Sequence, residues 1–232
     1  MTEKTPLLLL PGLLCDRTLW EAQVAALGDI AECHVPDLTR DDSFAAMADR
    51  TLAAAPERFA LAGLSMGGYV AQEIVRQAPE RVTRLALLDT SARADTPEQT
   101  KRRRDLIALS ERGRFHGVTA QLLPLLVHPD RVQESALVDI VIAMAAAVGA
   151  DGFRRQETAI LNRRDGRVDL GRIRVPTLVL CGRDDALTPP PLSREMAALI
   201  PRAQLRLIDR CGHLTTLERP AEVNAAMREW LA

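Results

Sequence analysis

Ser65 stands in a stretch of sequence that could make its hydroxyl a nucleophile. Residues 63–68 read Gly-Leu-Ser-Met-Gly-Gly, which places the serine in a G-x-S-x-G pattern. A short apolar run typical of a buried strand precedes the pattern at 59–62, and apolar residues at helical spacing follow it at 69–76. We therefore predict a sharp strand-to-helix turn, with strained backbone at Ser65 and its hydroxyl exposed at the edge of a sheet.

A serine hydroxyl is a poor nucleophile at neutral pH, so it needs a neighbouring base, which in turn needs an orienting group. Of the four histidines, only His213 comes just after a strand-like run, at 204–208, and leads into a final helix. That position puts His213 at the same carboxyl-terminal edge of a parallel sheet as Ser65. His213 is therefore the predicted base.

Three aspartates could orient that histidine. Asp184 and Asp185 are adjacent and follow the strand-like run at 177–181, and Asp89 directly follows the run at 84–88. Spacing alone does not choose between Asp184 and Asp185. For Asp89 we favour a role in capping or bracing its loop.

Strand-like and helical segments alternate along most of the chain, which favours a doubly wound, mostly parallel α/β sheet with helices on both faces. The alternation stops between about 91 and 164, where the pattern is continuously helical. We interpret residues 92–164 as a helical cap inserted over the carboxyl ends of the strands, where open α/β sheets bind ligands. Residues 1–91 and 165–232 then form the core.

Composition excludes several classes of function. The 232 residues carry a net charge of −1, which does not indicate nucleic acid or an anionic membrane surface as a partner. The apolar runs at 7–10 and 141–148 are too short for a signal-peptide core and a membrane span, so we expect a cytoplasmic protein. The cysteines and histidines show no metal-ligand spacing, and we predict no metal site.

Together these motifs resemble the α/β-hydrolase fold superfamily, in its branch of small-substrate esterases and lactonases. The resemblance rests on the turn at 63–68, the acid loop at 182–189 and the Gly212-His213 pair, and it covers almost the whole chain except the cap. The family's acid lies three residues after the loop glycine and four before the proline, which selects Asp185. The chain begins close to the strand before the family's oxyanion loop, so the resemblance implies a six-stranded sheet that lacks the family's first two strands.

The resemblance also implies an oxyanion hole made of two backbone N–H groups. Met66 would supply one, and Leu13, in the loop after the first strand, would supply the other. Pro11 stands where the family usually has a histidine, so no side chain of residue 11 can brace this loop by a hydrogen bond. Leu14 and, in the cap, Met144 are the predicted substrate contacts.

We therefore predict a serine hydrolase that cleaves a carboxylic ester or lactone of a small molecule through an acyl-enzyme on Ser65, without metal or organic cofactor. Other enzymes could use the same residues: an acyltransferase, a perhydrolase or a carbon–carbon bond hydrolase. A non-catalytic receptor for a small ligand is the alternative from another class. The sequence makes no prediction of the oligomeric state.

Overall fold

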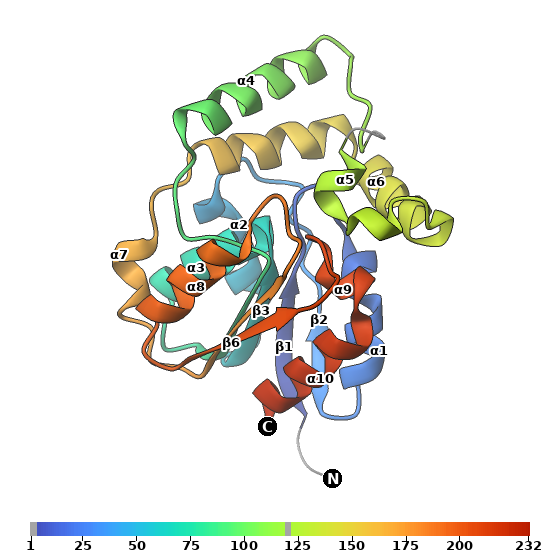
Figure 1. Cartoon of the computed structure of the whole chain (residues 1–232). Helices are drawn as coiled ribbons and strands as arrows, with labels where there is room; N and C mark the ends of the chain where they lie inside the picture. The colour runs from blue at the N-terminus through green and yellow to red at the C-terminus, as the bar shows by residue number, and fades with distance from the viewer. Residues whose placement is uncertain (1–3, 119–121) are drawn as a thin grey trace.

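A sheet of six parallel strands forms the centre of the protein (Figure 1). The computed structural model describes residues 4–118 and 122–232. The strand order is β2-β1-β3-β4-β5-β6, and every neighbouring pair is parallel. The strands are β1 (Thr5–Leu10), β2 (Ala31–His34), β3 (Phe59–Leu64), β4 (Val82–Leu88), β5 (Thr177–Gly182) and β6 (Ala203–Ile208). The prediction of a parallel six-stranded sheet is confirmed.

Helices cover both faces of this sheet, as a doubly wound fold requires. One face, which includes Leu7 and Leu9 of β1, packs with α1 (Glu21–Leu27) and α10 (Pro220–Leu231). The other face, which includes Leu8 and Leu10, packs with three helices: α2 (Phe44–Ala54), α3 (Met66–Gln77) and α8 (Pro190–Leu199). Alternate residues of one strand therefore enter two separate cores, which explains why the central strands are apolar throughout.

The register brings the carboxyl ends of the central strands to one edge. Leu10 at the end of β1 lies beside Gly63, Leu64 beside Leu88, and Leu88 beside Leu180. The loops that follow β1, β3, β4, β5 and β6 consequently emerge side by side. In open α/β sheets this edge is where ligands bind.

The chain between β4 and β5 is helical. It contains α4 (Pro97–Glu111), α5 (Leu123–Leu126), the 3₁₀ helix η2 (Pro129–Arg131), α6 (Ser135–Leu161) and, just before β5, α7 (Arg167–Leu170). Figure 1 shows α4 and α6 stacked beyond the main body of the fold. We propose that residues 92–164 act as a cap on a core of residues 1–91 and 165–232.

The apolar helix α6 extends well beyond the apolar run at 141–148 that stands out in the sequence. By length and composition α6 could cross a membrane, whereas the run at 141–148 alone is too short. However, α6 breaks at Gly149, where φ is 67° and ψ is −179°. Val141 and Met144 before the break, and Phe153 and Gln156 after it, are buried within the protein. These four residues belong to the folded core, whereas Ile140 and Ile142 of the same helix are exposed.

The remaining helices are short and flank the loops of the carboxyl edge. They are η1 (Arg17–Trp20), which follows the loop after β1, and α9 (Thr215–Glu218), which follows the loop after β6. Asp16 caps η1 by accepting a hydrogen bond from the Thr18 N–H (2.8 Å).

Candidate active site

Ser65 is the only residue between β3 and α3, and it has a strained backbone, with φ 54° and ψ −115°. Its N–H donates to the Leu88 carbonyl (2.9 Å), and its carbonyl accepts from the Thr90 hydroxyl (2.7 Å). A Cβ atom at Gly67 would lie 2.1 Å from the Leu10 carbonyl oxygen. Only glycine therefore lets the start of α3 approach β1 closely enough to form this turn.

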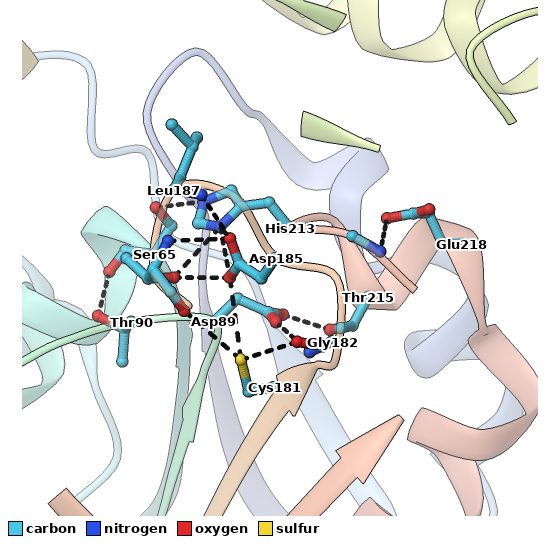
Figure 2. Close-up of polar contacts among 12 residues, drawn as sticks. Ser65, Asp89, Thr90, Cys181, Gly182, Asp185, Leu187, His213, Thr215 and Glu218 are labelled. Atoms are coloured by element: carbon cyan, nitrogen blue, oxygen red, sulfur yellow. Dashed lines mark hydrogen bonds and ion pairs between the residues drawn. The ribbon is translucent and has the colours of Figure 1, made fainter. Parts of the chain in front are cut away.

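His213 lies beside the serine. It belongs to the loop between β6 and α9, its side chain is buried, and its Nε2 atom is 2.8 Å from the Ser65 Oγ atom (Figure 2). That separation is a hydrogen-bond distance, and the serine hydroxyl donates if Nε2 carries no proton. In this arrangement the imidazole can take the serine proton directly.

Asp185 orients the imidazole from the opposite side. The His213 Nδ1 atom is 3.0 and 2.9 Å from the two carboxylate oxygens of Asp185. The carboxylate also accepts from the Leu187 N–H (2.8 Å) and from the N–H and hydroxyl of Thr188 (2.9 and 2.7 Å). Asp184 instead points away, and its carboxylate lies 3.5 Å from the ring of His128. The structure thus brings together Ser65, His213 and Asp185, and not Asp184.

The opposite charges of Asp185 and His213, which are both buried, stabilise each other. Burial alone would raise the pKa of Asp185, but the charge of His213 and the hydrogen bonds from His213 and Thr188 outweigh it and hold this pKa below its ordinary value. Burial alone would lower the pKa of His213, and the carboxylate of Asp185 outweighs it and raises that pKa. The site therefore favours the imidazolium form of His213.

Asp89 is buried next to this pair and braces two loops. Its carboxylate accepts from the Gly182 N–H (2.9 Å) at the end of β5 and from the Thr215 hydroxyl at the start of α9. Burial, followed by the charge of Asp185, raises the pKa of Asp89. The side-chain ligand atoms of Asp89, Cys181 and Asp185 lie close enough together to hold a metal ion. However, the oxygens of both carboxylates already accept hydrogen bonds, and burial raises the pKa of the Cys181 thiol. These contacts match the loop-bracing role favoured for Asp89.

Glu218 is a buried residue of the site that the sequence reasoning missed. Its carboxylate accepts from the Gly212 N–H (2.9 Å), next to His213, and from the His128 N–H (2.7 Å) in the helical insertion. Leu126, also in the insertion, accepts through its carbonyl from the His213 N–H (3.1 Å). Burial raises the pKa of Glu218. Nothing in the sequence separates this glutamate from the exposed ones, because only the tertiary structure buries it.

The two residues predicted to form an oxyanion hole flank Ser65. Met66 is the first residue of α3, so its N–H has no acceptor within the helix. Leu13 lies in the loop after β1, and a Cβ atom at the preceding Gly12 would sit 3.5 Å from the Cβ of Ser65. Among the residues that the structure describes, no acceptor pairs with the Leu13 N–H. Both N–H groups are therefore free to serve as donors, and their role stays a prediction.

The two predicted substrate contacts, Leu14 and Met144, are both buried and belong to one apolar cluster that joins the loop after β1 to the insertion. A contact with substrate at either residue stays a prediction. A surface cavity of about 350 Å³ lies elsewhere, between α3 and the connection from α6 to α7. Its lining includes Tyr69 and Arg163 and none of Ser65, Asp185 and His213.

Comparisons with known proteins agree with this fold. The chain matches the model of the alpha/beta hydrolase family over residues 7–226. It is 28% identical to a pimeloyl-[acyl-carrier protein] methyl ester esterase of Nitrosomonas europaea, over 93% of this chain and 91% of the relative. A thermophilic esterase from Thermogutta terrifontis superposes with a TM-score of 0.91 at 32% identity, over 98% of this chain and 89% of the esterase.

An enol-lactonase from Burkholderia xenovorans LB400 superposes with a TM-score of 0.85 over 99% of this chain and 92% of its own. Because its identity to this chain is 23%, this likeness concerns the fold alone. The family match covers nearly the whole chain, and relatives in the same family act as esterases. The chain therefore belongs to the alpha/beta hydrolase family and is an enzyme of the hydrolase type.

Proposed function

We propose that the protein is a serine hydrolase that cleaves a carboxylic ester or lactone of a small molecule through an acyl-enzyme on Ser65. One observation carries the proposal: the continuous chain of hydrogen bonds from Asp185 through His213 to the half-buried Ser65. The esterases among the relatives support the same class of substrate.

In the first half of the reaction, the Ser65 oxygen attacks the substrate carbonyl carbon while its proton moves to the Nε2 atom of His213. Asp185 holds the imidazole in the tautomer with its proton on Nδ1 and stabilises the imidazolium. The carbonyl oxygen becomes negatively charged and accepts hydrogen bonds from the N–H groups of Met66 and Leu13. His213 then donates its proton to the alkoxide as the carbon–oxygen bond breaks, which releases the alcohol.

In the second half, His213 takes a proton from water, whose oxygen attacks the acyl carbon. The tetrahedral intermediate is held by the same two N–H groups, and the bond between carbon and the Ser65 oxygen breaks as His213 returns the proton to serine. The acyl group leaves as a carboxylic acid. Leu14 and Met144 are proposed to contact the apolar part of the substrate.

A substitution at Ser65 tests the mechanism. We expect Ser65→Ala to lose hydrolysis of a p-nitrophenyl ester and covalent labelling by a fluorophosphonate probe, because both reactions need the serine oxygen. Ser135→Ala, which alters an exposed serine at the start of α6, should leave both at the level of the wild type. Hydrolysis and labelling that persist in purified Ser65→Ala would show that another group is the nucleophile.

Product analysis separates the alternatives. With a short alcohol or hydrogen peroxide added, a hydrolase still releases mainly the free acid, whereas an acyltransferase or a perhydrolase forms the new ester or the peracid. A receptor without activity would neither turn over esters nor react with the probe. A carbon–carbon bond hydrolase would cleave diketones in preference to esters.

A further inference from the structure

Gln156 lies in a position to control the loop after β1, although it belongs to α6 of the insertion. Its side chain is fully buried. The Oε1 atom accepts from the Leu14 N–H (3.0 Å), and the Nε2 atom donates to the Leu38 carbonyl (3.3 Å). One amide thus joins the insertion to two separate loops of the core.

The two bonds fix the orientation of this amide. A backbone N–H requires an acceptor, and a backbone carbonyl requires a donor, so only one of the two amide orientations satisfies both partners. No hydrophobic residue could replace Gln156 without leaving two buried backbone groups unpaired. An ionised glutamate could not donate to Leu38. The site is therefore specific for an uncharged side chain with both a donor and an acceptor.

Leu14 needs an external restraint. Its φ of 58° lies in the left-handed region, which is unfavourable for a residue with a side chain and persists only where the surroundings enforce it. Residue 11 is a proline, which has neither a side-chain hydrogen bond nor a backbone N–H to offer. Within the loop itself, the Cys15 N–H donates to the Gly12 carbonyl (3.2 Å). Among the residues that the structure describes, Gln156 supplies the hydrogen bond that ties the backbone of Leu14 to a segment outside the loop, while the Leu14 side chain packs in the apolar cluster.

We propose that Gln156 is a positioning residue for the oxyanion loop: it holds the backbone at Leu14 so that the adjacent Leu13 N–H points at the developing oxyanion beside Ser65. The inference rests on the proposed function, since the Leu13 N–H matters only if an oxyanion forms there. It also assigns the insertion a part in catalysis, because the restraint comes from α6. The bond replaces the bracing that the side chain of residue 11 cannot provide.

Gln156→Met tests the proposal, because methionine is similar in length but forms neither hydrogen bond. We expect kcat on a p-nitrophenyl ester to fall roughly 10- to 100-fold, somewhat less than full loss of an oxyanion donor, with KM within about three-fold of the wild type. A trifluoromethyl ketone, whose adduct with serine bears an oxyanion, should bind weaker by a similar factor. A purely structural role would lower the melting temperature without weakening this inhibitor.

Arg155→Ala is the matched control. Arg155 is the neighbouring residue on α6, is exposed, and donates to the Thr39 carbonyl (3.2 Å) in the same loop as Leu38, whereas the Leu14 N–H pairs with Gln156. We expect its kcat and inhibitor affinity to equal those of the wild type. A folded Gln156→Met variant with unchanged kcat and inhibitor affinity would overturn the proposal.

Amide hydrogen exchange of the wild-type protein provides a test that does not depend on any variant folding. With ¹⁵N-leucine labelling, the Leu14 N–H should exchange slowly in the free protein. The Leu13 N–H should exchange faster and become protected when a boronic acid occupies Ser65. Exchange of Leu14 as fast as that of Leu13 would refute the restraint. A fully active Ser65→Ala variant would instead refute the proposed function, so the two failures are distinguishable.

Discussion

The buried carboxylate of Glu218 allows a sharp test of how the loop that carries His213 is held. Glu218→Gln keeps the volume of the side chain but replaces one carboxylate oxygen by an NH₂ group, which cannot accept the N–H of Gly212 or of His128. One buried backbone N–H then faces a donor instead of an acceptor. The other accepting bond remains, without the negative charge that strengthened it.

The loss of stability in Glu218→Gln can be worked out from these two hydrogen bonds. Hydrogen bonds to a charged group contribute about 1.5–3 kcal/mol each, so the two bonds together stabilise the fold by about 3–6 kcal/mol. Burial of the carboxylate, which raises the pKa of Glu218, offsets part of this gain. We therefore expect Glu218→Gln to lower the free energy of unfolding by about 2–4 kcal/mol, which lowers the melting temperature by roughly 5–15 °C for a chain of this size.

Activity should fall as well, because Gly212 precedes His213 and sets the place of its ring. A misplacement of the imidazole by about 1 Å from Ser65 can cost ~10²-fold in rate, so we expect kcat to fall about 10- to 100-fold at 25 °C, with little change in KM. The control is Glu80→Gln, which alters an exposed glutamate in the turn after α3. Calorimetry and steady-state kinetics of both variants make the comparison. A Glu218→Gln protein that melts within about 1 °C of the wild type would refute this reasoning.

Two further predictions concern pH and the turn at Ser65. The proposed base His213 must be neutral to accept a proton, so its raised pKa places the acid limb of the kcat/KM profile above 6.5, and a limb below 6.5 would contradict the influence of Asp185. The stability that comes from the raised pKa of His213 is fully present below 6.5 and is lost as the pH rises through the folded-state pKa. The stability that comes from the lowered pKa of Asp185 is present above 3.8 and is lost as the pH falls through its folded-state pKa. Gly67→Ala should destabilise the fold by at least about 4 kcal/mol or abolish soluble expression, because the added Cβ would lie 2.1 Å from the Leu10 carbonyl oxygen. The control is Gly171→Ala, which should melt like the wild type because its Cβ would lie 3.9 Å from the Leu199 carbonyl oxygen.

The order and type of the core elements could be predicted because they depend on local patterns. Apolar runs of strand length and helical spacing alternate in the sequence, and glycine and proline mark their ends. The positions of Ser65 and His213 after their strands followed from the same patterns, since parallel strands end at one edge. The insertion was less predictable. Helical structure resumes after the break at Gly149 and extends to Leu161, because the positive φ of this glycine interrupts the helix and a second helical segment starts directly after it.

The choice of the acid shows the limit of local reasoning. Asp184 and Asp185 are chemically identical neighbours, and the resemblance to a family selected Asp185, whereas residue spacing alone left both open. In the structure the two side chains diverge: Asp185 is buried against His213, and Asp184 lies beside His128 near the surface. Which carboxylate faces the histidine is a property of how the loop folds back on β6, which neither residue type reveals.

The sequence by itself determined the parallel sheet, the strained turn at Ser65 and the position of His213 after the last strand, because the alternation of strand and helix patterns, the turn chemistry and the helix periodicity depend on neighbouring residues. Only the tertiary structure decided which buried polar groups hold these residues in place. Glu218 is 90 positions from its partner His128, and Gln156 is 142 positions from Leu14. Such bonds form only after distant segments pack together and exclude water, since a buried backbone N–H must then find an acceptor within the protein.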